Sequence, residues 1–170
     1  MSEGQTAQTG EEVTFESASA SEPADFAKFG ALVYGVVAAG MFLTTGLSAT
    51  LGDDGAAYFS GTEEAFYRAA ATSLNSAIAP LALLAVGLAL YYHLNDEISE
   101  ASHKPAAIAA AAGSAVAIVG LLLLVSVFEP SGLPAARSIS LGDELLGAVG
   151  AVVGLAVTAA IAGFGLDNLE

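Results

Sequence analysis

The chain has 170 residues, of which 55% are hydrophobic, and its 18 acidic residues outnumber its 4 basic ones to give a formal net charge of −14. This balance argues against nucleic acid as a partner, because nucleic-acid binding needs clustered Lys and Arg to replace counterions. The absence of cysteine excludes disulfides, thiolate metal sites and thiol catalysis.

Four apolar stretches without a charged residue dominate the sequence. They cover residues 29–52, 69–92, 105–128 and 145–166. A bilayer core of roughly 30 Å needs about 20 apolar residues of helix, and lipid offers no partners to backbone N–H and C=O groups. The pattern therefore predicts an all-α, polytopic membrane protein, built as a four-helix transmembrane bundle with up-down-up-down topology. The expected helices cover residues 27–50, 64–93, 105–128 and 144–166.

A polar tail precedes the first expected helix. Residues 1–25 are rich in Ser, Glu, Ala, Thr and Gly and offer few side chains to bury. Such a composition cannot offset the entropy of ordering the chain, so we expect this acidic tail to be disordered. The transmembrane domain then occupies residues 26–170. Phe26, Lys28 and Phe29 mark its entry into the membrane, as aromatic rings at headgroup level beside an ammonium that can snorkel.

The second expected helix carries a polar turn followed by a proline. The turn contains Thr72, Ser73, Asn75 and Ser76. Pro80 has no N–H to donate, which frees the carbonyl of Ser76 and kinks the helix. A kink beside an Asn and hydroxyls forms a candidate binding site of Thr72, Asn75, Ser76 and Pro80 that faces the bundle. Interhelical hydrogen bonding, with Thr45 of the first helix at a similar depth, is the favoured interpretation of the same residues.

A polar segment from His93 to Lys104 follows the second helix. We expect the helix to continue into water for a turn or more, and Pro105 to lie in the first turn of the third helix, where a missing N–H costs nothing. One face of the extended helix would carry His93, Asp96, Glu97, Glu100 and His103. Imidazoles and carboxylates can hold a divalent metal, but the two histidines would lie about 15 Å apart on a straight helix. A solvated acidic face is therefore favoured, and no metal site is predicted.

Small residues form stripes on three of the expected helices. Gly113 and Gly120 share a face of the third helix, Gly147 and Gly154 share a face of the fourth, and Gly150 forms a GxxxG motif with Gly154. Small faces let helix backbones approach closely, which provides dispersion contact where lipid supplies no hydrophobic drive. Packing within the bundle is the favoured role, because four helices can absorb three stripes. The alternative is a stripe left over for a partner chain.

The two halves of the chain resemble each other in their charges. Lys28 and Lys104 stand near the starts of the first and third helices, and Glu63-Glu64 and Asp143-Glu144 open the second and fourth. A duplicated helix–loop–helix unit and a coincidence of composition both explain this pattern. Two basic residues fall on each side of the membrane, so the positive-inside rule does not decide the orientation. We expect a multi-pass protein of the cell membrane with cytoplasmic N- and C-termini, because the inner segments are then the short ones.

Motifs that would indicate catalysis are missing from the sequence. There is no GxSxG, HExxH, Walker-type or dinucleotide-binding motif, and both histidines lie outside the apolar stretches, where they cannot ligate a haem inside the bundle. The prediction is a non-catalytic integral membrane protein without a cofactor. It would be a small subunit or scaffold in contact with the lipid bilayer and with other membrane proteins or copies of itself. A channel or small-solute carrier that uses the polar turn and the Pro80 kink is the alternative, although no ionisable residue lies in the middle of a span.

The overall composition also points to a kind of source. An acidic, lysine-poor chain with helices rich in Ala, Gly, Val and Leu resembles the proteins of salt-loving archaea in general. In concentrated salt, charge repulsion is screened and carboxylates hold hydrated cations. The resemblance covers the whole chain and names no family, and it implies a halophilic archaeal protein.

Overall fold

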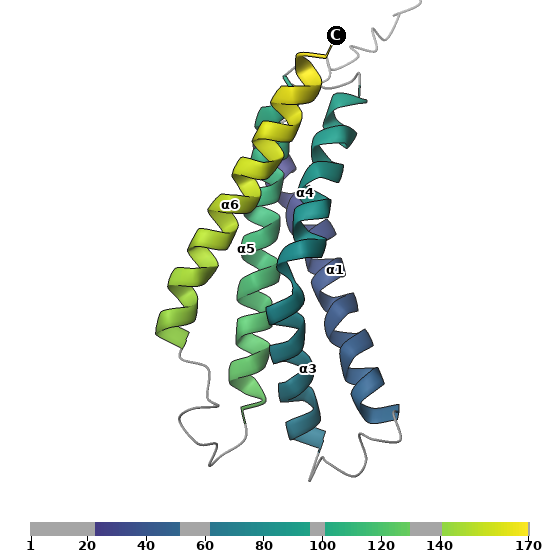
Figure 1. Cartoon of the computed structure of the whole chain (residues 1–170), viewed down its shortest axis with the longest axis vertical. Helices are drawn as coiled ribbons and strands as arrows, with labels where there is room; N and C mark the ends of the chain where they lie inside the picture. The colour runs from purple at the N-terminus through teal and green to yellow at the C-terminus, as the bar shows by residue number, and fades with distance from the viewer. Residues whose placement is uncertain (1–22, 52–61, 96–100, 130–140, 170) are drawn as a thin grey trace, which may run out of the picture.

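The computed structural model describes residues 23–51, 62–95, 101–129 and 141–169 (Figure 1). Every regular element in these residues is a helix, so the all-α class is confirmed for this part of the chain. The helices are α1 (Pro23–Leu51), α3 (Thr62–Ser76), α4 (Ile78–His93), α5 (His103–Val127) and α6 (Leu141–Asp167). The expected disorder of the tail falls outside the described residues, except for residues 23–25.

The first helix begins at Pro23, earlier than the sequence suggested. Proline suits the first turn of a helix because its missing N–H has no partner there in any case. Asp25 lies in the same turn, where a carboxylate interacts favourably with the helix dipole, and its Oδ1 lies 3.0 Å from Nζ of Lys28. The last three residues of the expected tail are therefore helical.

Three helices are long and apolar enough to cross a membrane: α1, α5 and α6. The helices α3 and α4 pass the same test only as a pair, which is bent by 52°. With 15 and 16 residues, each of the two is about 23 Å long, which is shorter than a bilayer core of roughly 30 Å. The chain thus has three candidate spans, or four if the bent pair crosses as one, and this number is typical of a multi-pass membrane protein.

The central helix of the bundle is α5, which packs against α1, α3, α4 and α6 (Figure 1). In the most apolar 18-residue stretch of α5, half of the residues are buried, whereas only 17% are buried in the corresponding stretch of α6. Figure 1 shows α6 at the outside of the bundle, where its Leu141 end diverges from α5. The outer face of α6 is therefore left for lipid or for a partner, as is much of α1, of whose most apolar stretch 22% is buried.

The helices α1 and α5 cross with their backbones in close contact at Gly30 and Gly113. A Cβ atom on Gly113 would lie 2.5 Å from both the carbonyl oxygen of Gly30 and Cδ2 of Tyr34. A Cβ atom on Gly30 would overlap the backbone of Ala109. Tyr34 is fully buried, and its hydroxyl donates a hydrogen bond of 3.2 Å to the carbonyl of Leu81 in α4. The two glycines therefore let the backbones of α1 and α5 touch. Tyr34, which lies against Gly113, joins this contact to α4 through its hydrogen bond.

Aromatic rings form two separate clusters. The Tyr91 cluster contains Phe26, Phe29, Tyr91 and Tyr92, with ring centroids 5.2 to 6.3 Å apart. The Phe66 cluster contains Phe42, Phe66 and Phe128, with centroids 5.2 to 6.4 Å apart. The first cluster joins the start of α1 to the end of α4, and the second joins α1, the start of α3 and the residue after α5. The bent α3–α4 pair therefore begins at one cluster and ends at the other.

Candidate functional site

Pro80 produces the kink that the sequence predicts. Because Pro80 has no N–H, the carbonyl of Ser76 loses its usual helical donor, and α3 ends at that residue. The N–H of Ala77 turns to the carbonyl of Leu74, at 3.3 Å, and the Ser76 hydroxyl lies 3.4 Å from the carbonyl of Ser73. The expected single helix over residues 64–93 is consequently two helices that meet at Ala77 with a bend of 52°.

The residues of the predicted polar turn do not converge on one site. Ser73 is fully buried, and its hydroxyl donates to that of Thr45 in α1 at 3.3 Å, so this residue makes an interhelical hydrogen bond. Thr72, Asn75 and Ser76 are exposed on the surface of the bundle. The Ser76 hydroxyl donates back to the carbonyl of Thr72 at 2.8 Å. Among the four residues proposed as a binding site, Asn75 and Pro80 line two different cavities.

The first cavity, which we call the Asn75 pocket, has a volume of about 250 Å³ and lies between the α3–α4 break, α5 and α6. Its lining consists of Leu74, Asn75, Ala77, Ile78, Ile118, Leu122, Glu144, Gly147, Ala148 and Ala151. Glu144 supplies the carboxylate of this lining, although its position at the start of α6 suggested only a helix-opening acid. Sequence reasoning did not place Glu144 and Asn75 at the same pocket, because the bend of α3–α4 and the tilt of α6 decide that arrangement.

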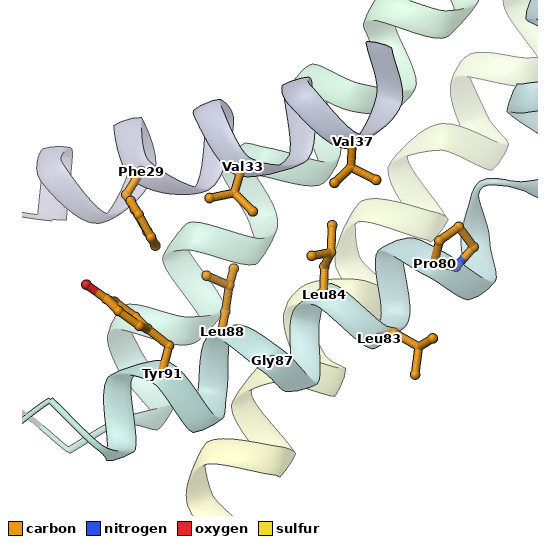
Figure 2. A pocket seen from close by; sticks show the side chains of 9 residues that line it. All are labelled: Phe29, Val33, Val37, Pro80, Leu83, Leu84, Gly87, Leu88 and Tyr91. Carbon is orange, nitrogen blue, oxygen red and sulfur yellow. The ribbon is translucent and has the colours of Figure 1, made fainter. Parts of the chain in front are cut away.

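The second cavity, which we call the Gly87 groove, has a volume of about 490 Å³ and lies between α1 and α4 (Figure 2). Its lining consists of Phe29, Val33, Val37, Pro80, Leu83, Leu84, Gly87, Leu88 and Tyr91. The rings of Phe29 and Tyr91 stack at one end of it, with centroids 5.2 Å apart (Figure 2). A Cβ on Gly87 would meet no atom within 4 Å, which leaves the groove open along α4. Its surface is almost entirely apolar.

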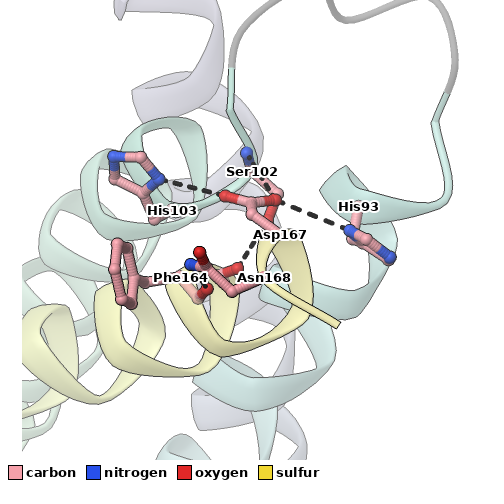
Figure 3. Close-up of polar contacts among 7 residues, drawn as sticks. His93, Ser102, His103, Phe164, Asp167 and Asn168 are labelled. Carbon is pink, nitrogen blue, oxygen red and sulfur yellow. Dashed lines mark hydrogen bonds and ion pairs between the residues drawn. The ribbon is translucent and has the colours of Figure 1, made fainter. Parts of the chain in front are cut away.

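A polar junction fixes the end of α6 to α4 and α5 (Figure 3). Oδ2 of Asp167 lies 3.0 Å from Nδ1 of His103, and Oδ1 lies 3.5 Å from Nδ1 of His93. The backbone N–H of Ser102 also donates to Oδ1 at 3.2 Å, and the Ser102 hydroxyl donates to the carbonyl of Gly163 at 3.2 Å. Because an ionised carboxylate only accepts, the hydrogen bond with His103 requires the proton on Nδ1.

The junction corrects the expected arrangement of the two histidines. The prediction placed them about 15 Å apart on one extended helix. Instead α4 ends at His93 and α5 begins at His103, so the chain reverses between them and both rings reach the same carboxylate. Pro105 does lie in the first turn of α5, as expected. Asp96, Glu97 and Glu100 of the predicted acidic face lie outside the described residues. No group of three or more His, Cys, Asp or Glu side chains in the part described is arranged to hold a metal ion.

The predicted small-residue faces differ in what they meet. Gly113 lies in the backbone contact with α1 described above. The other four glycines that were predicted to pack have open space around them, since a Cβ on each would meet no atom within 4 Å: Gly120, Gly147, Gly150 and Gly154. Gly163 at the other end of α6 is tightly packed, since its Cβ would lie 2.6 Å from Cα of His103. The helix α6 is thus closely packed near its C-terminus, and its earlier glycines face open space.

The chain was compared with protein-family models, with curated proteins and with solved structures, and none of the three comparisons found a match.

Proposed function

We propose that this chain is a non-catalytic integral membrane protein that works as a small subunit or scaffold of a larger membrane assembly. The observation that carries the proposal is the outer surface of α6. Only 17% of the residues in its most apolar 18-residue stretch are buried, and Gly147, Gly150 and Gly154 leave its backbone accessible to a neighbour. A second transmembrane helix can approach such a face closely, because small residues permit backbone contact. The partner is another membrane protein or a second copy of the chain.

The proposal includes a four-span, up-down-up-down bundle in the cell membrane, with α3 and α4 crossing together. The two aromatic clusters support this topology, since aromatic residues concentrate at both membrane interfaces. Phe66 near the start of α3 belongs to one cluster, and Tyr92 near the end of α4 belongs to the other. A re-entrant loop would return both helix ends to the same interface.

We further propose that the N- and C-termini are cytoplasmic, which rests on the short inner segments of the sequence. Because the chain has no cysteine, a single Cys introduced next to the N-terminus reports the orientation directly. An impermeant maleimide should label this Cys only after the cells are lysed. Labelling in intact cells would show that the N-terminus lies outside and would contradict the proposed orientation.

The acidic composition supports a halophilic archaeal source and a dependence on salt. Removal of salt should lower the helical content in detergent, because the repulsion of a net charge of −14 is then unscreened. Far-UV circular dichroism over a salt titration measures this effect. Full helicity and solubility at low ionic strength would contradict the halophilic interpretation.

The experiment that tests the subunit proposal is purification of the tagged chain from its own membranes in mild detergent. The proposal predicts defined membrane proteins at fixed stoichiometry in the eluate. A matched variant, Gly150→Leu, fills the accessible face of α6 without touching the rest of the bundle, and should release the partner. Gly87→Leu on α4 is the control, since its Cβ also meets open space but faces away from this surface.

A channel or small-solute carrier is the second candidate, and the break between α3 and α4 favours it. Broken helices in transporters place freed backbone groups and side chains beside a binding site. Here the break adjoins the Asn75 pocket, which contains an amide and a carboxylate. Asn75→Ala and Pro80→Ala should then alter solute flux in liposomes while the bundle stays folded. Absence of flux for the parent protein, or unchanged flux in both variants, would remove this candidate.

A further inference from the structure

The Asn75 pocket has two polar side chains, Asn75 and Glu144, and both are exposed at its rim. Neither Asn75 nor Glu144 forms a hydrogen bond or an ion pair with any residue in the described part of the chain. The two side chains belong to α3 and α6, and both line the same volume of about 250 Å³. Such a volume accommodates a small molecule rather than a single water.

Two features form the pocket: the α3–α4 pair bends on one side of it, and α6 has small residues on the other. The 52° bend at Ala77 moves the end of α3 out of line with α4. On α6, Gly147, Ala148 and Ala151 form the facing wall, and a Cβ on Gly147 would meet no atom within 4 Å. The bend and the small residues of α6 therefore both contribute to the space.

The lining carries one negative charge and no positive one. Glu144 is its carboxylate, and no Lys, Arg or His of the described residues lines the pocket. An anionic ligand would be repelled by this carboxylate, whereas a cationic ligand would be attracted to it. A divalent metal is disfavoured, because Ca²⁺ takes six to eight oxygen ligands and one carboxylate with one amide supplies few of them.

The rest of the lining is apolar, chiefly Ile78, Ile118 and Leu122. These side chains favour a hydrocarbon body, whereas an inorganic cation would lose its hydration against them. A ligand with one positive centre and a small apolar body matches both parts of the lining.

We propose that the Asn75 pocket binds a small organic monocation of the primary-ammonium class. The ammonium donates to the Glu144 carboxylate and to the amide oxygen of Asn75, and the hydrocarbon part packs on Ile118 and Leu122. The proposal concerns binding alone, and it stands whether the chain is a subunit or a carrier.

Calorimetric titration of the purified protein with cyclohexylammonium tests the proposal, in an uncharged maltoside detergent that carries no ammonium. Saturable binding to one site is expected for this probe, and none for cyclohexanol, its neutral analogue. Glu144→Gln should weaken binding by roughly tenfold. Glu129→Gln, which removes a carboxylate at the end of α5 outside the pocket, should leave binding unchanged.

Gly147→Leu is the second variant, and it fills the pocket without changing a charge. It should abolish binding while the circular dichroism spectrum stays that of the parent. No saturable binding to the parent, equal binding of cyclohexanol, or an equal loss in Glu129→Gln would overturn the proposal. Added phosphatidylethanolamine distinguishes the source of the ammonium: competition with the probe indicates a lipid headgroup, and no competition indicates a free amine.

Discussion

Oδ2 of Asp167 lies 3.0 Å from Nδ1 of His103, and this contact fixes the end of α6 at the start of α5 (Figure 3). The close approach of Gly163 to His103 strengthens the same attachment. At its other end, α6 lines the Asn75 pocket with Glu144 and Gly147 and makes no comparable polar contact with a described residue. The helix α6, whose outer face is open, is therefore held firmly at one end.

Asp167→Asn should destabilise the bundle by about 1–3 kcal/mol, because the variant removes the charge that accepts from the Ser102 N–H and from Nδ1 of His103 and that lies 3.5 Å from Nδ1 of His93. Unfolding with increasing SDS in mixed micelles, followed by circular dichroism, measures the change. Asp25→Asn is the matched control, since its pair with Lys28 is largely exposed and worth about 0–1 kcal/mol. Equal effects of the two variants would show that the junction contributes no more than a surface ion pair.

Gly113→Ala should destabilise the protein by about 1–3 kcal/mol, because the added methyl group meets the backbone of Gly30 at 2.5 Å. Gly120→Ala lies about two turns further along the same face of α5, where the new Cβ meets no atom within 4 Å, and it should not destabilise the protein. Thermal unfolding of the two variants side by side separates crowding from the ordinary effect of replacing glycine in a helix. A stable Gly113→Ala protein would contradict the close α1–α5 crossing.

Pro80→Ala should reduce the bend between α3 and α4, because alanine restores an N–H that can donate to the carbonyl of Ser76. Arg68 and Leu90 are both exposed and lie on opposite sides of the break. The distance between spin labels at these two positions, measured by double electron–electron resonance, should increase in the variant. Pro105→Ala, in the first turn of α5, should leave this distance unchanged. An unchanged distance in Pro80→Ala would assign the bend to packing around Ala77 instead.

Tyr34→Phe should cost about 0.6 kcal/mol, the typical value of one interhelical hydrogen bond within a membrane, because it removes the donor to the Leu81 carbonyl. The buried ring keeps its packing, so the helical content should not change. Tyr91→Phe, whose side chain is 47% exposed, is the control and should be neutral in the same SDS titration. A loss no larger than that of the control would mean that the Tyr34 hydroxyl contributes nothing to stability.

The helices were predictable from the sequence because lipid imposes a simple requirement on length and polarity. The Pro80 kink was also predictable, since a missing N–H acts locally. The position of Asp167 between His93 and His103 was not, because the reversal of the chain between α4 and α5 decides it. The position of Asn75 and Glu144 at one pocket was not predictable for a similar reason, as it depends on the tilt of α6. Gly113 and Gly150 lie in stripes that look alike in sequence, and only the three-dimensional arrangement shows that Gly113 is packed whereas Gly120 of the same stripe and Gly150 face open space.

The measurement that tests the central claim most directly is the native mass of the chain purified from its own membranes at high salt. The account predicts a complex of fixed stoichiometry, with other membrane proteins or with further copies of the chain, that dissociates in Gly150→Leu and persists in Gly87→Leu. A monomer that carries only lipid and detergent, with a mass unaffected by Gly150→Leu, would contradict it.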